Sequence, residues 1–300
     1  MGYFGLACIT LPLSAFVSAC AGITMKKHID ERMSFAQDVV GTSRRSQPTS
    51  LVLDGEVAYL KIRISARDPD TGTGYLGIGE YALPANPELR LKFGLLAKAL
   101  SSQPLPSPKP GRHQNIFRYD FRLAGKAYSG AYDFSLGKDF NSKLKSFGEI
   151  KSAILNSGTP VVGFRPELSA QASDGQITIS LQMVNTGETP LEFAGPSAWH
   201  QEEGERTVAS VAVGVSPPGG VGSVYYLDSE HLIAEDSRYC EVISIEPANS
   251  VTLRFLYPMR DAVASPVEYV VAARMVAMVV APKRFEGPIE TGLDVVRMVY

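Results

Sequence analysis

The stretch Ile177-Thr-Ile-Ser-Leu-Gln-Met183 runs directly into the turn sequence Asn185-Thr-Gly-Glu-Thr-Pro190. Its apolar residues alternate with polar ones, which is the period of a strand with one buried face. Comparable runs, separated by turn sequences, follow at residues 211–215, 224–227, 251–257 and 269–281. A series of short strands divided by turns predicts an antiparallel β-sandwich over residues 163–300.

Residues 51–162 combine strand and helix signals. Apolar and basic residues alternate in two runs, 60–67 and 117–123, so each run is predicted to form a strand with one outward, basic side. A helix is predicted over residues 141–156, where apolar residues recur on one face, whereas residues 87–100 begin like a strand and end like a helix. We therefore expect a mainly β chain, with an N-terminal α+β domain followed by the β-sandwich.

The charge is divided unevenly between these two parts. The chain of 300 residues carries 29 Lys and Arg against 31 Asp and Glu, a net charge of -2. Up to Arg165 there are 21 basic and 13 acidic residues, a net charge of +8, and the rest of the chain carries -10. The near-neutral total argues against a dedicated nucleic-acid-binding protein, which is usually strongly basic.

The N-terminus has the character of a targeting segment. Residues 1–24 carry no charge, and an apolar run ends in Val17-Ser18-Ala19-Cys20. This tetrapeptide resembles the lipobox of bacterial lipoprotein precursors, in which small residues precede an invariant cysteine. The resemblance implies a signal peptide over residues 1–19 and a lipid on Cys20, and we expect residues 20–50 to form a tether with a short helix near residues 30–40. A plain secretory signal or anchor, or ordinary core sequence, are the alternative interpretations.

The lipobox resemblance also implies a location. The residue after the cysteine is Ala21 and not aspartate, which in lipoproteins of this type suggests the outer membrane. We therefore expect a lipid-anchored, periplasm-facing protein. Two or three acyl chains anchor a protein firmly, because each buried CH2 contributes about 0.8 kcal/mol. Cys8 lies in the leader, and Cys240 alone cannot form an internal disulfide or a cysteine-rich zinc site. We expect Cys240 to be a buried, unreactive thiol.

Three matches to cofactor or catalytic motifs lack the partners that their chemistry requires. The glycines of residues 72–77 fit the dinucleotide-binding pattern, but they follow a turn and precede a strand. Residues 68–79 begin like a calcium loop and lack the glutamate at its twelfth position. The Ser-x-x-Lys matches at residues 135–138 and 142–145 have no second motif of the penicillin-binding enzymes. The sequence therefore predicts no cofactor, no metal site and no catalytic residue.

The basic sides of the two N-terminal strands are the candidate binding surface. One strand carries Lys61, Arg63 and Arg67 on its outward face, and the other carries Arg118 and Arg122. If the two strands are neighbours in one sheet, these five cations form a stripe that attracts an acidic partner over a long range. An ordinary solvated strand face is the alternative.

The sequence thus favours a protein that works by binding and is not an enzyme. We expect a protein partner and a membrane contact through the lipid anchor, and no nucleic acid. The anchor and the Ig-like strand pattern loosely resemble those of envelope lipoproteins, among them the immunity lipoproteins of bacterial secretion systems, which neutralise a toxic effector. One alternative is a structural or assembly accessory of the envelope. Another is an envelope hydrolase in which His200 and Glu203 act as base and orienter.

Overall fold

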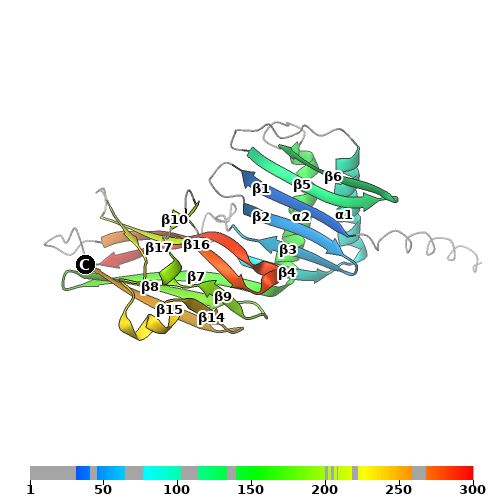
Figure 1. Cartoon of the computed structure of the whole chain (residues 1–300). Helices are drawn as coiled ribbons and strands as arrows, with labels where there is room; N and C mark the ends of the chain where they lie inside the picture. Colours follow the sequence, from blue (N-terminus) through cyan, green and yellow to red (C-terminus); the bar gives the residue numbers. More distant parts are fainter. Residues whose placement is uncertain are drawn as a thin grey trace, which may run out of the picture.

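The structure, a computed structural model, is mainly β, as the sequence predicts (Figure 1). Two large antiparallel sheets and two α-helices form the main layers of its described part. The described residues are 32–40, 46–64, 77–102, 114–133, 140–199, 202–203, 206–207, 209–217, 222–258 and 268–299.

One sheet runs through both halves of the chain. Its nine strands lie in the order β15-β8-β7-β4-β3-β2-β1-β5-β6, and neighbouring strands are antiparallel. The strands, in chain order, are β1 (Met33–Val40), β2 (Ser46–Asp54), β3 (Val57–Ile62), β4 (Ile78–Pro84), β5 (Gln114–Leu123), β6 (Lys126–Asp133), β7 (Thr159–Ser173), β8 (Gln176–Asn185) and β15 (Ser250–Pro258). Because β4 pairs with β7, the sheet continues from the N-terminal into the C-terminal half.

Two helices, α1 (Pro87–Ser101) and α2 (Phe140–Ser157), cover one face of β1 to β6 (Figure 1). The prediction of a helix near residues 141–156 is confirmed by α2. The ambiguous segment before it is helical from Pro87, because Asn86 Oδ1 accepts the backbone N–H of Leu89 at 2.8 Å and proline suits the first turn. Phe93 of α1 packs on Phe35 of β1, with ring centroids 6.1 Å apart, in an apolar core that lies between helices and sheet.

The second large sheet packs against β7, β8 and β15 and completes the predicted β-sandwich. Ile179, Leu253 and Phe255 of the first sheet meet Val213 and Met275 of the second in the core between them. The second sheet has the order β13-β12-β16-β9-β14, with β17 also paired to β16. The remaining elements are β9 (Leu191–Ala194), η2 (Pro196–Ala198), β10 (Glu202–Glu203), β11 (Arg206–Thr207), β12 (Ser210–Ser216), β13 (Ser223–Tyr226), η3 (Ala234–Tyr239), β14 (Val242–Ile245), β16 (Glu268–Ala281), η4 (Lys283–Phe285) and β17 (Gly287–Val299).

The two halves of the nine-stranded sheet are covered on opposite faces. Residues that are Cα partners share a face, and Glu80 of β4 is partnered by both Lys61 of β3 and Val162 of β7. Val162 is buried in the sandwich core, whereas Leu60 and Tyr81, one position along their strands, contact the core under the helices. The second sheet therefore lies on the face that the helices do not cover.

Two predictions about chain organisation differ from the structure. We predicted a tether over residues 20–50 with a helix near residues 30–40, but β1 and most of β2 lie in this range. Met33 and Phe35 are buried under the helices, so their alternation with polar residues marks a strand. The predicted domain boundary at residue 163 lies inside β7, which pairs first with β4 and then with β8. The two apolar cores are therefore joined by a continuous strand and not by a linker.

The segment η4 closes the end of the sandwich against β3. The Phe285 ring is fully buried in the sandwich core, and the Arg63 guanidinium carbon lies 4.6 Å from its centroid. The backbone N–H of Glu290, on β17, donates to the carbonyl of Arg63 at 2.9 Å. We call this contact between η4 and strands β3 and β4 the joint.

Phe285→Ala should lower the free energy of unfolding by about 3–5 kcal/mol, because it leaves a cavity where the sandwich meets the joint. Urea denaturation followed by circular dichroism measures the change. Leu95→Ala is the control, since Leu95 on α1 is 51% exposed and its truncation should cost no more than about 0.5 kcal/mol. Equal losses in the two variants would contradict a stabilising role for η4.

Candidate functional site

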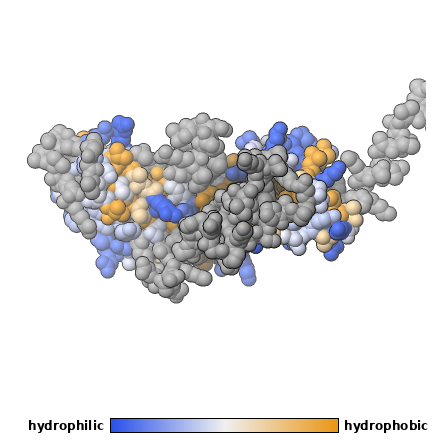
Figure 2. All heavy atoms as spheres, turned by 90° about the horizontal axis from the view of Figure 1, so that it is seen from above, coloured by the Kyte–Doolittle hydropathy of each residue, from blue (hydrophilic) through white to orange (hydrophobic). Residues whose placement is uncertain are grey.

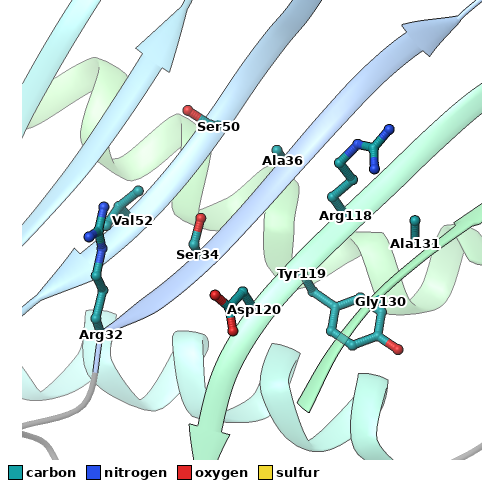
Figure 3. A pocket seen from close by; sticks show the side chains of 10 residues that line it. All are labelled: Arg32, Ser34, Ala36, Ser50, Val52, Arg118, Tyr119, Asp120, Gly130 and Ala131. Carbon is teal, nitrogen blue, oxygen red and sulfur yellow. The ribbon is translucent and has the colours of Figure 1, made fainter. Parts of the chain in front are cut away.

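The face of the N-terminal sheet opposite the helices carries a groove with a floor of small side chains (Figure 3). Strands β1, β2, β5 and β6 line it, and its volume is about 650 Å³. Ser34, Ala36 and Ser50 form the floor, because alternate residues of β1 and β2 point away from the helices. Small side chains on adjoining strands leave room for an inserted side chain or loop.

Charged residues stand around this floor. Figure 3 shows Arg32 and Arg118 on opposite sides of the groove, with Ser34 and Ala36 between them. On β5 the exposed residues Arg118 and Arg122 flank Asp120, at a spacing that places all three on the open face. The rim therefore presents cations in excess, with one carboxylate among them.

A second hollow of about 310 Å³ extends the groove toward the sandwich. The two hollows share Arg32, Ser50 and Val52 as lining residues. Glu80 and Arg284 lie at the far side of the second hollow, where η4 meets the sheet. One groove thus runs from β6 across the open face to the joint.

Hydrogen bonds to charged groups hold the joint. Glu80 is only 6% exposed, and its carboxylate accepts two hydrogen bonds from Arg284, at 2.6 Å from Nη2 and 3.0 Å from Nε. Lys61 Nζ donates to the backbone carbonyl of Arg284 at 2.7 Å, and Arg63 Nη2 donates to that of Glu286 at 2.8 Å. The buried carboxylate is therefore paired bidentately, the geometry in which an ion pair best offsets its desolvation.

The surroundings change the pKa of both basic groups that bracket Glu80. Burial is the main influence on Lys61 and lowers the pKa of its ammonium group, while the Glu80 carboxylate acts in the opposite direction. The hydrogen bond to Glu80 raises the pKa of the Arg284 guanidinium. The Lys61 ammonium group thus donates to the backbone of η4 in place of water, and the Arg284 guanidinium is stabilised in its charged form.

The predicted stripe of five cations is corrected by the sheet order. Lys61 and Arg63 are part of the joint, and Arg67 lies outside the described residues. Arg118 and Arg122 lie on β5, which β2 and β1 separate from β3. Three strand spacings of about 4.8 Å put the two groups roughly 14 Å apart, so they do not form the single stripe of adjacent cations that neighbouring strands would give.

The other predicted positions have mixed outcomes. Cys20 and His200 lie outside the described residues, and Glu203 is described only as part of the short strand β10. Trp199, next to His200, is buried in the sandwich core, with Nε1 donating to the carbonyl of Ala194 at 3.0 Å. Cys240 is a free thiol but is partly exposed, which differs from the predicted buried position.

Neither a metal-binding cluster nor a membrane-spanning helix is found among the described residues. They contain no group of three or more histidine, cysteine or carboxylate side chains that could hold a metal ion. None of their helices combines the length and apolar character needed to cross a membrane.

An exposed apolar surface lies at the sandwich end of the molecule. Figure 2, which views the molecule from above, shows apolar side chains on this end. Val270 on β16 and Val299 on β17 are 40% and 68% exposed. They lie beside the surface ion pair of Arg297 with Glu268, whose Nη1 and Oε1 atoms are 3.2 Å apart, so apolar and charged groups are mixed here.

Sequence analysis missed the carboxylate at the centre of the joint. Glu80 is the one charged residue in Ile78-Gly-Glu-Tyr-Ala-Leu83, which was a signal for a buried and paired charge. Its partner Arg284 is 204 residues away, in a short segment between two strands. No local pattern connects two positions at that separation.

Glu80→Gln should lower the free energy of unfolding by about 1–3 kcal/mol, since the half-exposed Arg284 guanidinium loses the charge of the buried carboxylate that it pairs with. Chemical denaturation measures the loss. Glu88→Gln is the matched control, because Glu88 also pairs with a cation, Lys92 at 2.9 Å, but on an exposed helix surface. We expect no measurable change in that control. Indistinguishable midpoints for the two variants would show that the joint gains nothing from the buried ion pair.

No protein-family model matches this chain, and no curated protein matches it. Inference about its function therefore starts from the groove, its charged rim and the joint that fixes one end of it.

Proposed function

We propose that this chain is a lipid-anchored, periplasm-facing protein of the bacterial outer membrane that binds a protein partner in the groove on its open sheet face. The observation that carries the proposal is the contrast between the two halves of one sheet. In the C-terminal half, this face of the sheet packs against a second sheet and is buried in the core between them. In the N-terminal half, the same face carries the groove, with its floor of small residues and its charged rim.

The chemistry of the groove suits recognition of a protein surface. Ser34 and Ser50 offer hydroxyl groups on the floor, and Val52 offers an apolar contact. Arg118 and Arg122 on the rim suit a partner with carboxylates, and the excess of basic charge in this half of the chain accelerates the encounter with an acidic surface. Shape and charge together support binding as the function, in place of catalysis.

The position of the groove agrees with the proposed anchor. A lipid on Cys20 would be joined to Arg32, at the mouth of the groove, by 12 residues. A chain of that length spans at most about 40 Å when fully extended. The partner would therefore be held close to the membrane surface.

Neutralisation of a toxic effector, as by an immunity lipoprotein of a secretion system, is the specific role that we propose for this binding. A rigid surface is suited to occluding another protein, since little conformational entropy is lost on association. The joint supports such rigidity by fixing β3 and β4 to the sandwich. A structural role in envelope assembly would use the same groove for a permanent partner.

The anchor is tested by the intact mass and membrane fraction of the wild type and of Cys20→Ala. We expect the wild-type protein to begin at Cys20, to carry acyl chains and to sediment with the membrane, because the thiol is the acceptor of the lipid. The Cys20→Ala protein should lack the acyl mass and be lost from the membrane fraction. Two full-length proteins without added mass would overturn the proposed location.

The groove is tested by filling it. Ser50→Tyr places an aromatic ring over the floor of the groove, where it would clash with the bound partner. We expect the amount of partner that is cross-linked to the protein in envelope extract to fall at least tenfold. Ser180→Tyr is the matched control, since Ser180 is also a partly exposed strand serine, on the outer face of β8. Equal recovery of the same partner by Ser50→Tyr and by the wild type would remove the groove from the proposal.

A further inference from the structure

We propose that strand β6 is a docking edge, to which an extended acidic segment of the partner adds as a further antiparallel strand. The inference rests on the proposed function, because it specifies how the protein partner is held. Its basis is the backbone and the charge pattern of β5 and β6 at the outer side of the groove.

The two edge strands of the nine-stranded sheet, β15 and β6, differ in their hydrogen-bonded neighbours. At β15 the neighbouring segment pairs with the edge: Leu256 N–H donates to the carbonyl of His231 at 2.9 Å, and Ile233 N–H donates to that of Arg254 at 3.0 Å. The Asp236 carboxylate adds hydrogen bonds from the backbone and the guanidinium of Arg254. At the opposite edge, β6 pairs with β5 on one side and with no other described strand (Figure 1).

The turn between β5 and β6 determines which backbone groups point outward. Ala124 and Gly125 both have positive φ, 52° and 78°, as a two-residue type I′ turn requires. The flanking residues Leu123 and Lys126 then exchange hydrogen bonds with each other, and every second pair along the hairpin does the same. The residues between them direct N–H and C=O groups away from β5, namely Ala127, Ser129 and Ala131.

Strand β6 itself carries none of three features that often protect an edge strand. Such features are proline, bulges and charged side chains in the middle of the strand. The pairing of β5 with β6 runs without a register shift from Ile116 to Leu123, and residues 127–132 contain neither proline nor a charged side chain. The edge is therefore a template that a further strand can extend.

Charge on the open face identifies the strand that fits. Across the hairpin Arg118 is the partner of Ala131 and Arg122 is the partner of Ala127, and these small residues leave the long arginine side chains room to extend over β6. Each such pair of partners lies in one row that runs across the strands on the open face. A strand added beyond β6 would place its own side chains in the same rows. Carboxylates in those two rows would be attracted.

The row between them imposes a second condition. Asp120 is the partner of Ser129, so a carboxylate in the middle row would meet a like charge. The segment that fits has acidic residues four positions apart, with an uncharged or basic residue midway between them.

An acidic partner is favoured over a second copy of this chain. Pairing of two β6 edges would bring the β5 arginines of both copies to the same seam, in halves that each carry a net charge of +8 up to Arg165. Like charges across a seam oppose association, whereas an acidic segment neutralises them.

The probe is the synthetic peptide acetyl-Thr-Glu-Val-Ser-Val-Glu-Thr-amide, titrated into the full chain in detergent. We expect it to bind, to protect the amides of Ala127, Ser129 and Ala131 from hydrogen exchange, and to bind better than the peptide with lysine for glutamate. Ser129→Pro removes an outward N–H that makes no bond to β5 and should weaken binding at least tenfold, while Ser129→Thr should stay within twofold. Arg122→Glu should weaken binding about fivefold, the scale of an exposed ion pair.

A modification of the peptide makes the test independent of protein folding. N-methylation of the serine amide removes a donor that faces β6 and should abolish binding, whereas N-methylation of a valine amide, which faces outward, should leave it unchanged. Equal effects of the two methyl groups, or protection confined to residues elsewhere, would overturn strand addition.

Two further outcomes distinguish a failure of strand addition at β6 from a failure of the proposed binding in the groove. If Ser129→Pro captures the envelope partner as well as the wild type does while Ser50→Tyr does not, the edge proposal fails and the groove proposal stands. If the full chain forms a concentration-dependent dimer that Ser129→Pro dissolves, and the peptide does not bind, the occupant of the edge is a second copy and the acidic-segment proposal is wrong.

Discussion

The pairing of β4 with β7 is the constraint on which the rest of the structure depends, because it joins two halves of one sheet that are covered on opposite faces. Glu80 and Val162 are partners across this pairing and share a face. Within one strand spacing, that face changes from the site of a buried carboxylate to the interior of an apolar core. Such a change needs a seal, and η4 supplies it with Phe285 on one side and Arg284 on the other.

One side of this seal consists of charged groups, because the backbone carbonyls of η4 need hydrogen-bond donors. A 3-10 segment at a sheet surface leaves backbone carbonyls without partners, and water or side-chain donors must satisfy them. Lys61 and Arg63 are long enough to reach the carbonyls of Arg284 and Glu286, and Glu80 pairs with the Arg284 guanidinium beside them. A buried ion pair contributes little net stability compared with an apolar contact, but it accepts one arrangement of its partners. We infer that the joint chiefly fixes orientation, and that it removes two cations from the surface available to a partner.

The sequence predicts the elements of this fold much better than their arrangement. Period-two alternation identifies β5, β8 and β16, and the capped apolar face identifies α2, since each signal is local. The same alternation shows that Lys61 and Arg118 point away from the helices, and both do lie on the open face. Their separation depends on which strands lie between them, and β1 and the first part of β2 lie in the segment that we predicted as a tether. Sheet order is a non-local property, so the alternation predicts the outward face of each strand but not which strands are neighbours.

The open face, the bare edge and the proposed anchor all belong to the N-terminal part of the chain. The sandwich, at the other end, encloses most of its strands between two sheets and uses residues 231–240 to cover its own outer edge. The fold covers the β15 edge by direct hydrogen bonding, whereas β6 has only β5 as a neighbour among the described strands. An anchor on Cys20, as proposed, would hold this surface within about 40 Å of the membrane and so would raise its effective concentration toward partners confined there. We therefore propose that the sandwich is the rigid support and that the N-terminal sheet is the surface that meets the partner.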